Sequence, residues 1–156
     1  MIYPYELEND KNYPSEEDFT VNYSRTKGSG IYVNRKFKKG EMVARMTGIT
    51  VPYVLQHTLQ ISPWLHLYDP HFTGLLLHSC DPLVFLDMNK LEIWALQDIE
   101  KGDALTMDYA STEDILYRQF PCACGSDNCR GWITGRKERI NEQGRRYLQN
   151  LERKCG

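Results

Sequence analysis

Three closely spaced cysteines constrain this chain more than any other feature. Cys122, Cys124 and Cys129 follow the spacing C-x-C-x4-C, and Gly125 lets the chain turn back between them. Zinc in a structural site takes four ligands at the corners of a tetrahedron, with sulfur at about 2.3 Å. Three thiols are one ligand short, so another group must complete the set if the cluster binds metal. The alternative is a group of reduced thiols without a metal.

A fourth ligand has several candidate sources: Cys80, Cys155, a histidine or an external ligand. Cys80 lies in a turn between an apolar run and Pro82, which makes its position rigid. Cys155 is next to the last residue, and chain ends usually fray. The predicted ligands of one structural zinc ion are therefore Cys80, Cys122, Cys124 and Cys129.

Length, composition and charge narrow the class of protein. At 156 residues and 41% hydrophobic, the chain is expected to form one domain with a real core. The net charge of −2 gives no global attraction to nucleic acid, so we expect no direct nucleic-acid binding. Residues 1–24 are acidic and residues 130–156 basic; these are either two solvated ends or an acidic arm that attracts a basic substrate.

The sequence also predicts a location. No apolar segment approaches the roughly 20 residues that a membrane span needs, and the N-terminus lacks the basic and apolar regions of a signal peptide. Five cysteines in such a chain suggest a reducing compartment. We therefore expect an intracellular protein, cytoplasmic or nuclear, with no membrane partner.

Short apolar runs separated by turn residues predict a mainly β protein, and no helices alternate with them as parallel βαβ units require. Residues 28–30 are expected to form a flexible turn, residues 1–17 a loose arm, and residues 53–60 a short helix. A final amphipathic helix is expected within residues 136–154, because its apolar side chains share one face. The expected strands are residues 19–23, 31–33, 42–46, 84–86, 91–96 and 104–107, with 84–86 and 91–96 paired as a hairpin.

Four motifs, in order along residues 19–135, resemble those of SET-domain protein lysine methyltransferases with a post-SET zinc loop. Lys27–Tyr32 (KGSGIY) is similar to the family's glycine turn beside the cofactor. Leu77–Leu83 (LHSCDPL) resembles its Asn-His-Ser-Cys-x-Pro-Asn motif, and Asp103–Tyr109 (DALTMDY) resembles its Glu-Glu-Leu-Thr-Phe-Asp-Tyr motif. Phe120–Gly131 resembles the post-SET loop. Each motif alone is weak, but all four in order are specific.

The resemblance implies a mainly β SET-domain fold of small sheets, with a C-terminal pseudoknot, a zinc-binding post-SET loop and a terminal α-helix. In the pseudoknot, the third motif is threaded beside the second. The implied zinc ligands are the motif cysteine and the three post-SET cysteines, the set reached above. The expected parts are an N-terminal arm (1–18), the SET domain (19–112), the post-SET zinc loop (113–135) and the C-terminal helix (136–156).

For function, the resemblance implies methyl transfer from S-adenosylmethionine to a lysine side chain in a protein or peptide substrate. It makes Tyr109 the catalytic residue, whose hydroxyl aligns the amine and places an oxygen dipole near the methyl group. Trp132 is equally compatible with packing against the final helix. The residues expected to bind the methyl donor are Lys27, Gly28, Ser29, Gly30, Tyr32, Leu77, His78, Tyr109 and Trp132.

Three positions depart from the family. Leu77 and Leu83 stand where the family has asparagine, and loss of the polar contact at Leu77 is expected to cost about 1 kcal/mol of donor binding. Met107 replaces an aromatic residue that tunes the number of methyl groups, and this flexible side chain is expected to permit more than one.

Two alternative functions remain. One is a SET-type methyltransferase that acts on a small amine. The other is a zinc-stabilised binding module that has lost catalysis. Leu77 favours the second alternative, whereas Tyr109, the glycine turn and the four cysteines oppose it.

Overall fold

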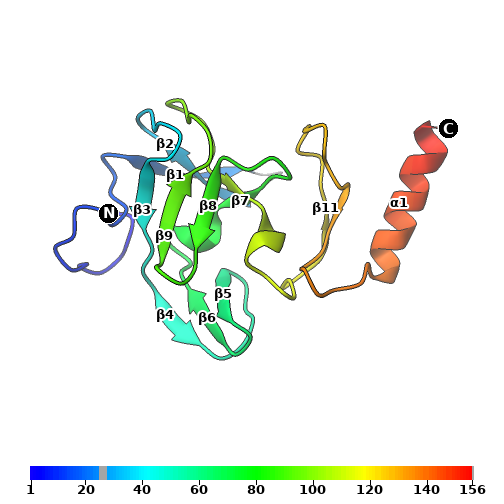
Figure 1. Cartoon of the computed structure of the whole chain (residues 1–156), viewed down its shortest axis with the longest axis horizontal. Helices are drawn as coiled ribbons and strands as arrows, with labels where there is room; N and C mark the ends of the chain where they lie inside the picture. The colour runs from blue at the N-terminus through cyan, green and yellow to red at the C-terminus, as the bar shows by residue number, and fades with distance from the viewer. Residues whose placement is uncertain (25–27, 156) are drawn as a thin grey trace.

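The computed structural model describes residues 1–24 and 28–155, and it shows small β-sheets followed by a C-terminal helix (Figure 1). A mainly β architecture is thus confirmed. The helical elements are η1 (Thr73–Leu75), η2 (Tyr109–Ser111) and α1 (Glu142–Cys155). The strands are β1 (Phe19–Ser24), β2 (Gly28–Val33), β3 (Met42–Arg45), β4 (Ile49–Val51), β5 (Thr58–Ser62), β6 (Leu65–Tyr68), β7 (Leu77–His78), β8 (Val84–Asp87), β9 (Glu92–Ala95), β10 (Thr106–Met107), β11 (Phe120–Pro121) and β12 (Trp132–Ile133).

Strand pairing brings the second and third motifs together. β7 and β10 pair in parallel, with Leu77 opposite Thr106 and His78 opposite Met107. This pairing agrees with the threaded arrangement that the resemblance implied. The remaining sheets are the β1–β2 and β11–β12 hairpins and the three-stranded sheets β3-β9-β8 and β4-β6-β5. The antiparallel β8–β9 pair confirms the predicted hairpin.

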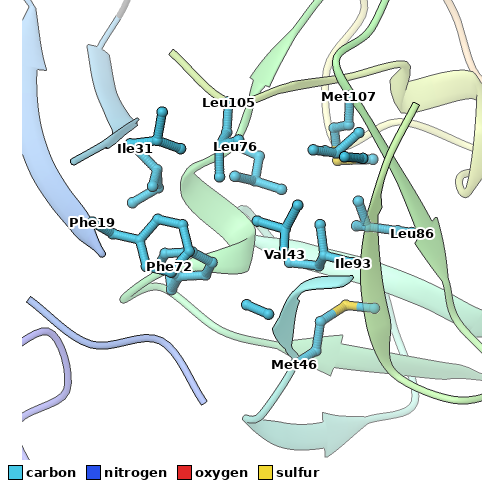
Figure 2. Packing of buried hydrophobic residues seen from close by; sticks show 14 of the residues in the cluster. Phe19, Ile31, Val43, Met46, Phe72, Leu76, Leu86, Ile93, Leu105 and Met107 are labelled. Carbon is cyan, nitrogen blue, oxygen red and sulfur yellow. The ribbon is translucent and has the colours of Figure 1, made fainter. Parts of the chain in front are cut away.

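One large apolar cluster holds the sheets of residues 1–112 in place (Figure 2). Ile31, Ile93 and Leu105, from β2, β9 and the approach to β10, expose none of their surface. Full burial of such a side chain stabilises a fold by about 1.5–3 kcal/mol. Leu76, which precedes the second motif, and Met107 of the third motif belong to the same cluster and are labelled in Figure 2. The core therefore fixes the backbone of both motifs.

Two expectations about local structure are wrong. Residues 53–60 form no helix, because residues 58–62 pair with β6 as β5. Residues 28–30 are not a flexible turn but the first half of β2, paired with β1. The expected C-terminal helix is confirmed: it begins at Glu142, and the Asn141 side chain caps it by accepting the backbone N–H of Gly144 at 2.8 Å.

The N-terminal arm is docked, contrary to the expectation of a loose segment. Tyr3 is only 3% exposed, and its hydroxyl donates to Asp69 Oδ2 at 2.8 Å. Farther along, the backbone N–H of Arg45 donates to the carbonyl of Asn12 at 2.8 Å. The prediction failed because a buried aromatic residue and one backbone contact anchor a segment whose composition is that of a loop.

Residues 113–155, named here the C-terminal lobe, pack around a second and smaller core, to which Cys80 contributes from outside the lobe. Its buried members are Cys80, Leu116, Cys122 and Ile133. The helix α1 packs on this lobe through the rings of Trp132 and Tyr147, whose centroids are 5.6 Å apart. In Figure 1, α1 lies at the edge of the molecule away from the N-terminal body, which comprises residues 1–24 and 28–112. No helix in the described part of the chain is long and apolar enough to cross a membrane.

Candidate functional site

A cavity of about 460 Å³ lies between the N-terminal body and the C-terminal lobe. This volume is typical of pockets that bind small ligands. Gly28 and Ser29 of the first motif, Leu77 of the second and Tyr109 of the third line the cavity, and Phe120 of the fourth also reaches it. The structure therefore brings all four motifs to one place. The other walls are residues 54–59, residues 73–76, Met107, Thr112, Glu113 and residues 116–118.

Tyr109 is fixed at the cavity wall by both its backbone and its side chain. Its hydroxyl donates to the carbonyl of Leu76 at 2.6 Å, and its backbone N–H donates to Nδ1 of His78 at 3.2 Å. Burial raises the pKa of Tyr109 to about 12, so the phenol keeps its proton at neutral pH. Its ring meets those of His78 and Phe120 edge to face, with centroid distances of 5.1 and 5.6 Å. The phenol oxygen thus has a fixed donor direction and free lone pairs.

His78 is a neutral bridge between the tyrosine and the cysteines. Burial lowers the pKa of its imidazole to about 4, against the opposing effect of Asp108. Because Nδ1 accepts the N–H of Tyr109, the proton is assigned to Nε2, which lies 3.5 Å from Cys80 Sγ. One side chain therefore connects the cavity wall to the thiol cluster.

Residues 28–30 are named here the glycine wall. Gly30 of this wall lies beside Leu77, one of the residues that depart from the family pattern. A Cβ atom added at Gly30 would lie 3.1 Å from Leu77 Cδ1 and 3.4 Å from Tyr32 Cε2. Glycine at position 30 therefore leaves room for a leucine at position 77. Lys27, also expected to contact the donor, lies outside the described residues.

The four cysteines expected to share a zinc ion lie together. Their Sγ atoms are within 4.8 Å of one another, and a tetrahedron with 2.3 Å bonds has sulfur–sulfur edges of about 3.8 Å. Burial raises the pKa of Cys80 and of Cys122, whereas hydrogen bonds from Ser126 lower the pKa of Cys124. Such a cluster is a donor set that suits zinc, since a bound cation would stabilise the thiolates. The ligand set Cys80, Cys122, Cys124 and Cys129 stays a prediction that this geometry fits.

Residues that the sequence analysis missed tie the thiol loop to the motifs. The Arg130 guanidinium makes two hydrogen bonds to the Asp108 carboxylate, at 2.9 and 2.6 Å. Burial alone would raise the pKa of Asp108, but Arg130 outweighs it and lowers the pKa. The Asn128 side chain donates to the carbonyl of Cys80 at 3.0 Å. These partners are 22 and 48 residues apart, so no local pattern could have revealed them.

A further group of polar contacts, named here the polar seam, joins Gln60 of β5 to Glu113 and Asp114 at the start of the C-terminal lobe. The Gln60 side chain and Asp114 bond reciprocally: Gln60 Nε2 donates to Asp114 Oδ2 at 2.8 Å, and the Asp114 N–H donates to Gln60 Oε1 at 2.7 Å. The Gln60 backbone N–H donates to Glu113 Oε2 at 2.8 Å. Burial raises the pKa of Glu113, whose side chain reaches the cavity. This seam therefore closes one side of the cavity.

Trp132 lies away from the cavity. It is 5% exposed, and its Nε1 donates to Gln119 Oε1 at 2.9 Å. A Cβ atom at Gly144 would lie 2.3 Å from that same Nε1, so the helix packs directly on the indole. Of the two roles open from the sequence, the structure shows the packing against the final helix.

Known proteins similar in sequence are methyltransferases. Methyltransferase flvH of Aspergillus flavus is 33% identical over 106 residues, which cover 67% of this chain and 60% of that protein. Histone-lysine N-methyltransferase 2B of Homo sapiens is 27% identical over 142 residues, covering 76% of this chain and 5% of that protein. The chain thus spans less than two thirds of these relatives. No family model matches the chain.

Solved structures agree on the fold. KRYPTONITE, in complex with mCHG DNA and SAH, has a TM-score of 0.61 and 23% identity, over 73% of this chain and 28% of that chain. The methyltransferase domain of human SETMAR has a TM-score of 0.58 and 19% identity, over 75% of this chain and 58% of that chain. The chain therefore has the SET-domain fold and is homologous to SET-domain methyltransferases, histone-lysine methyltransferases among them.

Proposed function

We propose that this chain transfers methyl groups from S-adenosylmethionine to the side-chain amine of a lysine in a protein or peptide. The observation that carries the proposal is the Tyr109 hydroxyl, fixed by the Leu76 carbonyl in a cavity that reaches the glycine wall. Relatives named histone-lysine methyltransferases support it. So do neighbours of similar fold, one solved with SAH and one with SAH and an H3(1-15) peptide. The class of protein substrate, histone or non-histone, is left open.

The residues of the cavity suit this chemistry. S-adenosylmethionine, when bound, would supply an activated methyl group: the neutral amine nitrogen would bond to the methyl carbon while the carbon–sulfur bond breaks and S-adenosylhomocysteine leaves. Free lysine has a pKa of about 10.4, so its ammonium must first lose a proton. The apolar side chains of Leu76, Leu77 and Phe120 disfavour a buried charge and lower that pKa. Tyr109 directs its O–H to Leu76, which leaves its oxygen lone pairs to orient the N–H groups of the amine.

The other assignments belong to the same proposal. The proposed donor wall consists of Gly28, Ser29 and Leu77, which line the cavity, and of Gly30, Tyr32 and His78, which are not among its lining residues, together with Lys27 beyond the described residues. One structural zinc ion would be held by the four cysteines and would order the loop that carries Phe120. The proposed parts are the arm (1–18), the SET domain (19–112), the zinc loop (113–135) and the helical end (136–156). The proposed location is inside the cell, where thiols stay reduced.

One pair of observations favours a second candidate, a SET-type enzyme that methylates a small amine. The relative with 33% identity is named only as a methyltransferase. The cavity of about 460 Å³ could also enclose a small free amine. A third candidate, a binding module without catalysis, would keep the zinc loop but have no use for the fixed tyrosine.

Two measurements on zinc-loaded protein separate the three candidates. Calorimetric titration with S-adenosylmethionine or S-adenosylhomocysteine is expected to show saturable binding at millimolar concentration or below. Its absence would defeat both enzymatic candidates. Incubation with methyl-labelled donor then compares a cell lysate with a panel of free amines. Label in protein supports the proposal, whereas label in a free amine alone supports the second candidate.

A further inference from the structure

His57 has an unusual backbone at the wall of the cavity. Its φ of 71° lies in the left-handed region, and among the described non-glycine residues only Leu91 shares this property. Leu91 belongs to the turn of the β8–β9 hairpin, and His57 precedes β5. Residues in this conformation are strained and persist where neighbouring structure holds them, often at ligand sites.

Contacts with the segment around η1 fix both the backbone and the ring of His57. Nδ1 lies 2.9 Å from the carbonyl oxygen of Gly74, and the carbonyl of His57 accepts the backbone N–H of Asp69 at 3.2 Å. A Cβ atom at Gly74 would lie 2.5 Å from the His57 carbonyl oxygen and 2.7 Å from its Cβ. The close approach requires glycine at position 74, so the imidazole has a defined place on η1.

The hydrogen bond to the Gly74 carbonyl determines which ring nitrogen of His57 remains available as an acceptor. A carbonyl oxygen only accepts, so Nδ1 carries the proton and donates, and Nε2 of the neutral ring is an acceptor. Within residues 1–24 and 28–155, no protein group hydrogen-bonds Nε2, and Nε2 is not among the buried polar atoms without a partner. Since His57 lines the cavity, this nitrogen is an accessible acceptor there.

The same short segment positions the Tyr109 hydroxyl. Gly74 holds the His57 ring and Leu76 holds the tyrosine, through carbonyls two residues apart. Two residues of chain span at most about 7 Å. The Asp69 carboxylate stiffens this segment by accepting the N–H groups of residues 71, 72 and 73 at 3.1, 3.2 and 2.8 Å. His57 and Tyr109 are therefore two polar groups set on one rigid support.

From this geometry we infer that His57 is a substrate-binding residue whose Nε2 accepts a hydrogen bond from an N–H group of the methyl acceptor. The inference rests on the proposed function, because it assumes that the cavity receives an amine. Leu59, Leu75 and Leu116 line the cavity too and offer no side-chain acceptor, so His57 adds one acceptor to those that Tyr109 and Glu113 supply for a buried N–H group. The donor is either the amine to be methylated or a main-chain amide beside it.

An NMR titration tests the inference without requiring turnover. Protein with ¹⁵N-labelled imidazoles is titrated with Nα-acetyl-lysine methylamide, with and without S-adenosylhomocysteine. Free protein should show His57 as the Nδ1–H tautomer, and the probe should shift the Nε2 signal. A shift of Tyr109 signals without a shift of His57 Nε2 would overturn the inference, and so would no shift anywhere. Nα-acetyl-norleucine methylamide, which lacks the amine, separates the sources: a shift with both probes identifies the amide, and a shift with the lysine probe alone identifies the amine.

His57→Asn is the matched variant. Asparagine tolerates a positive φ, and its side-chain N–H can replace Nδ1–H toward Gly74, but it has no equivalent of Nε2. The probe should bind the variant about fivefold more weakly, the effect of one lost hydrogen bond. S-adenosylhomocysteine affinity should stay within about twofold. Equal probe affinity in the two proteins would contradict the inference. Absence of S-adenosylhomocysteine binding would instead defeat the proposed function, while the titration without it still tests His57.

Discussion

The N-terminal body and the C-terminal lobe are stabilised in different ways. The body encloses one continuous apolar cluster in which Ile31, Ile93 and Leu105 are fully buried. The lobe packs around a cluster of only four buried residues: its own Leu116, Cys122 and Ile133, and Cys80 from the body. A core this small seldom supports a fold without a disulfide or a metal. The cavity between the two regions therefore has one wall stabilised by apolar packing and another stabilised by the cysteine cluster and by polar contacts.

Removal of zinc is expected to have the largest effect and to act on the lobe while leaving the body folded. Binding of structural zinc contributes about 10 kcal/mol or more to the folding of small zinc domains. Chelation of zinc-loaded protein should therefore abolish amide protection in residues 113–135, while Ile31 and Ile93 keep theirs because the body packs independently. Hydrogen exchange read by mass spectrometry measures both regions at once.

The variant Cys80→Ser provides the control for metal removal. It should bind less than one equivalent of zinc and show the same regional loss of protection as the chelated wild type. Uniform loss across body and lobe would mean that the two are one cooperative unit, contrary to the comparison. Unchanged protection after chelation would show that the lobe needs no metal.

The second-largest effect is expected where the two regions meet, at Tyr109. Tyr109→Phe keeps the ring contacts with His78 and Phe120 but removes the hydroxyl held by Leu76. Loss of one preorganised polar group at a reacting centre costs about 10²–10³ in kcat, so label transfer should fall by that factor. Calorimetry should show the affinity for S-adenosylhomocysteine within about twofold of wild type. Label transfer that survives undiminished would remove Tyr109 from the catalytic role.

A third and smaller effect, on the affinity for the methyl donor, is expected at Leu77, where the body lines the cavity. Leu77→Asn restores a polar side chain beside Gly30, where the leucine now fits against the glycine. One added hydrogen bond is worth about 1 kcal/mol, so S-adenosylhomocysteine should bind about fivefold more tightly by calorimetry. Leu83→Asn is the matched control, because Leu83 does not line the cavity within the described residues. Equal gains, or no gain at Leu77, would argue that position 77 does not contact the donor.

The sequence predicted well those features that one segment determines by itself. Alternating apolar residues predicted β1, since one buried face imposes a period of two, and two short apolar runs on either side of turn residues predicted the β8–β9 hairpin. Cysteine spacing predicted a cluster of three thiols, and the resemblance agreed on Cys80 as a fourth member. Each of these patterns can be interpreted within its own segment, without knowing which distant residues that segment contacts.

Features that depend on distant partners were missed. Residues 53–60 are helix-compatible alone, but β6 is available as a pairing partner and β5 forms instead. The Arg130–Asp108 pair and the docking of Tyr3 on Asp69 join residues 22 and 66 positions apart. Propensity and periodicity describe a segment in isolation, and tertiary contacts of this kind override them.

The smallest expected effect tests the polar seam between body and lobe. Burial raises the pKa of Glu113 in the folded protein above its unfolded value of about 4.3, against the opposing hydrogen bond from Gln60. Between these two pKa values the folded state binds more protons than the unfolded state, so stability falls as the pH rises through this window. Glu113→Gln keeps an oxygen for the Gln60 N–H and does not titrate. It should therefore be slightly more stable than wild type at pH 7 and equal to it below about pH 4.

Urea denaturation of both proteins at pH 4 and pH 7 measures this difference. Protonation of the zinc ligands at low pH affects wild type and variant alike, so it cancels when the two are compared. Asp114→Asn is the contrasting control, because the Gln60 side chain holds the pKa of Asp114 below its usual range, and this variant should be less stable at pH 7. If Glu113→Gln were less stable than wild type at pH 7, as Asp114→Asn is expected to be, burial would not be the dominant influence on Glu113. The seam would then be held by charge, like Arg130 with Asp108, rather than by packing like the body.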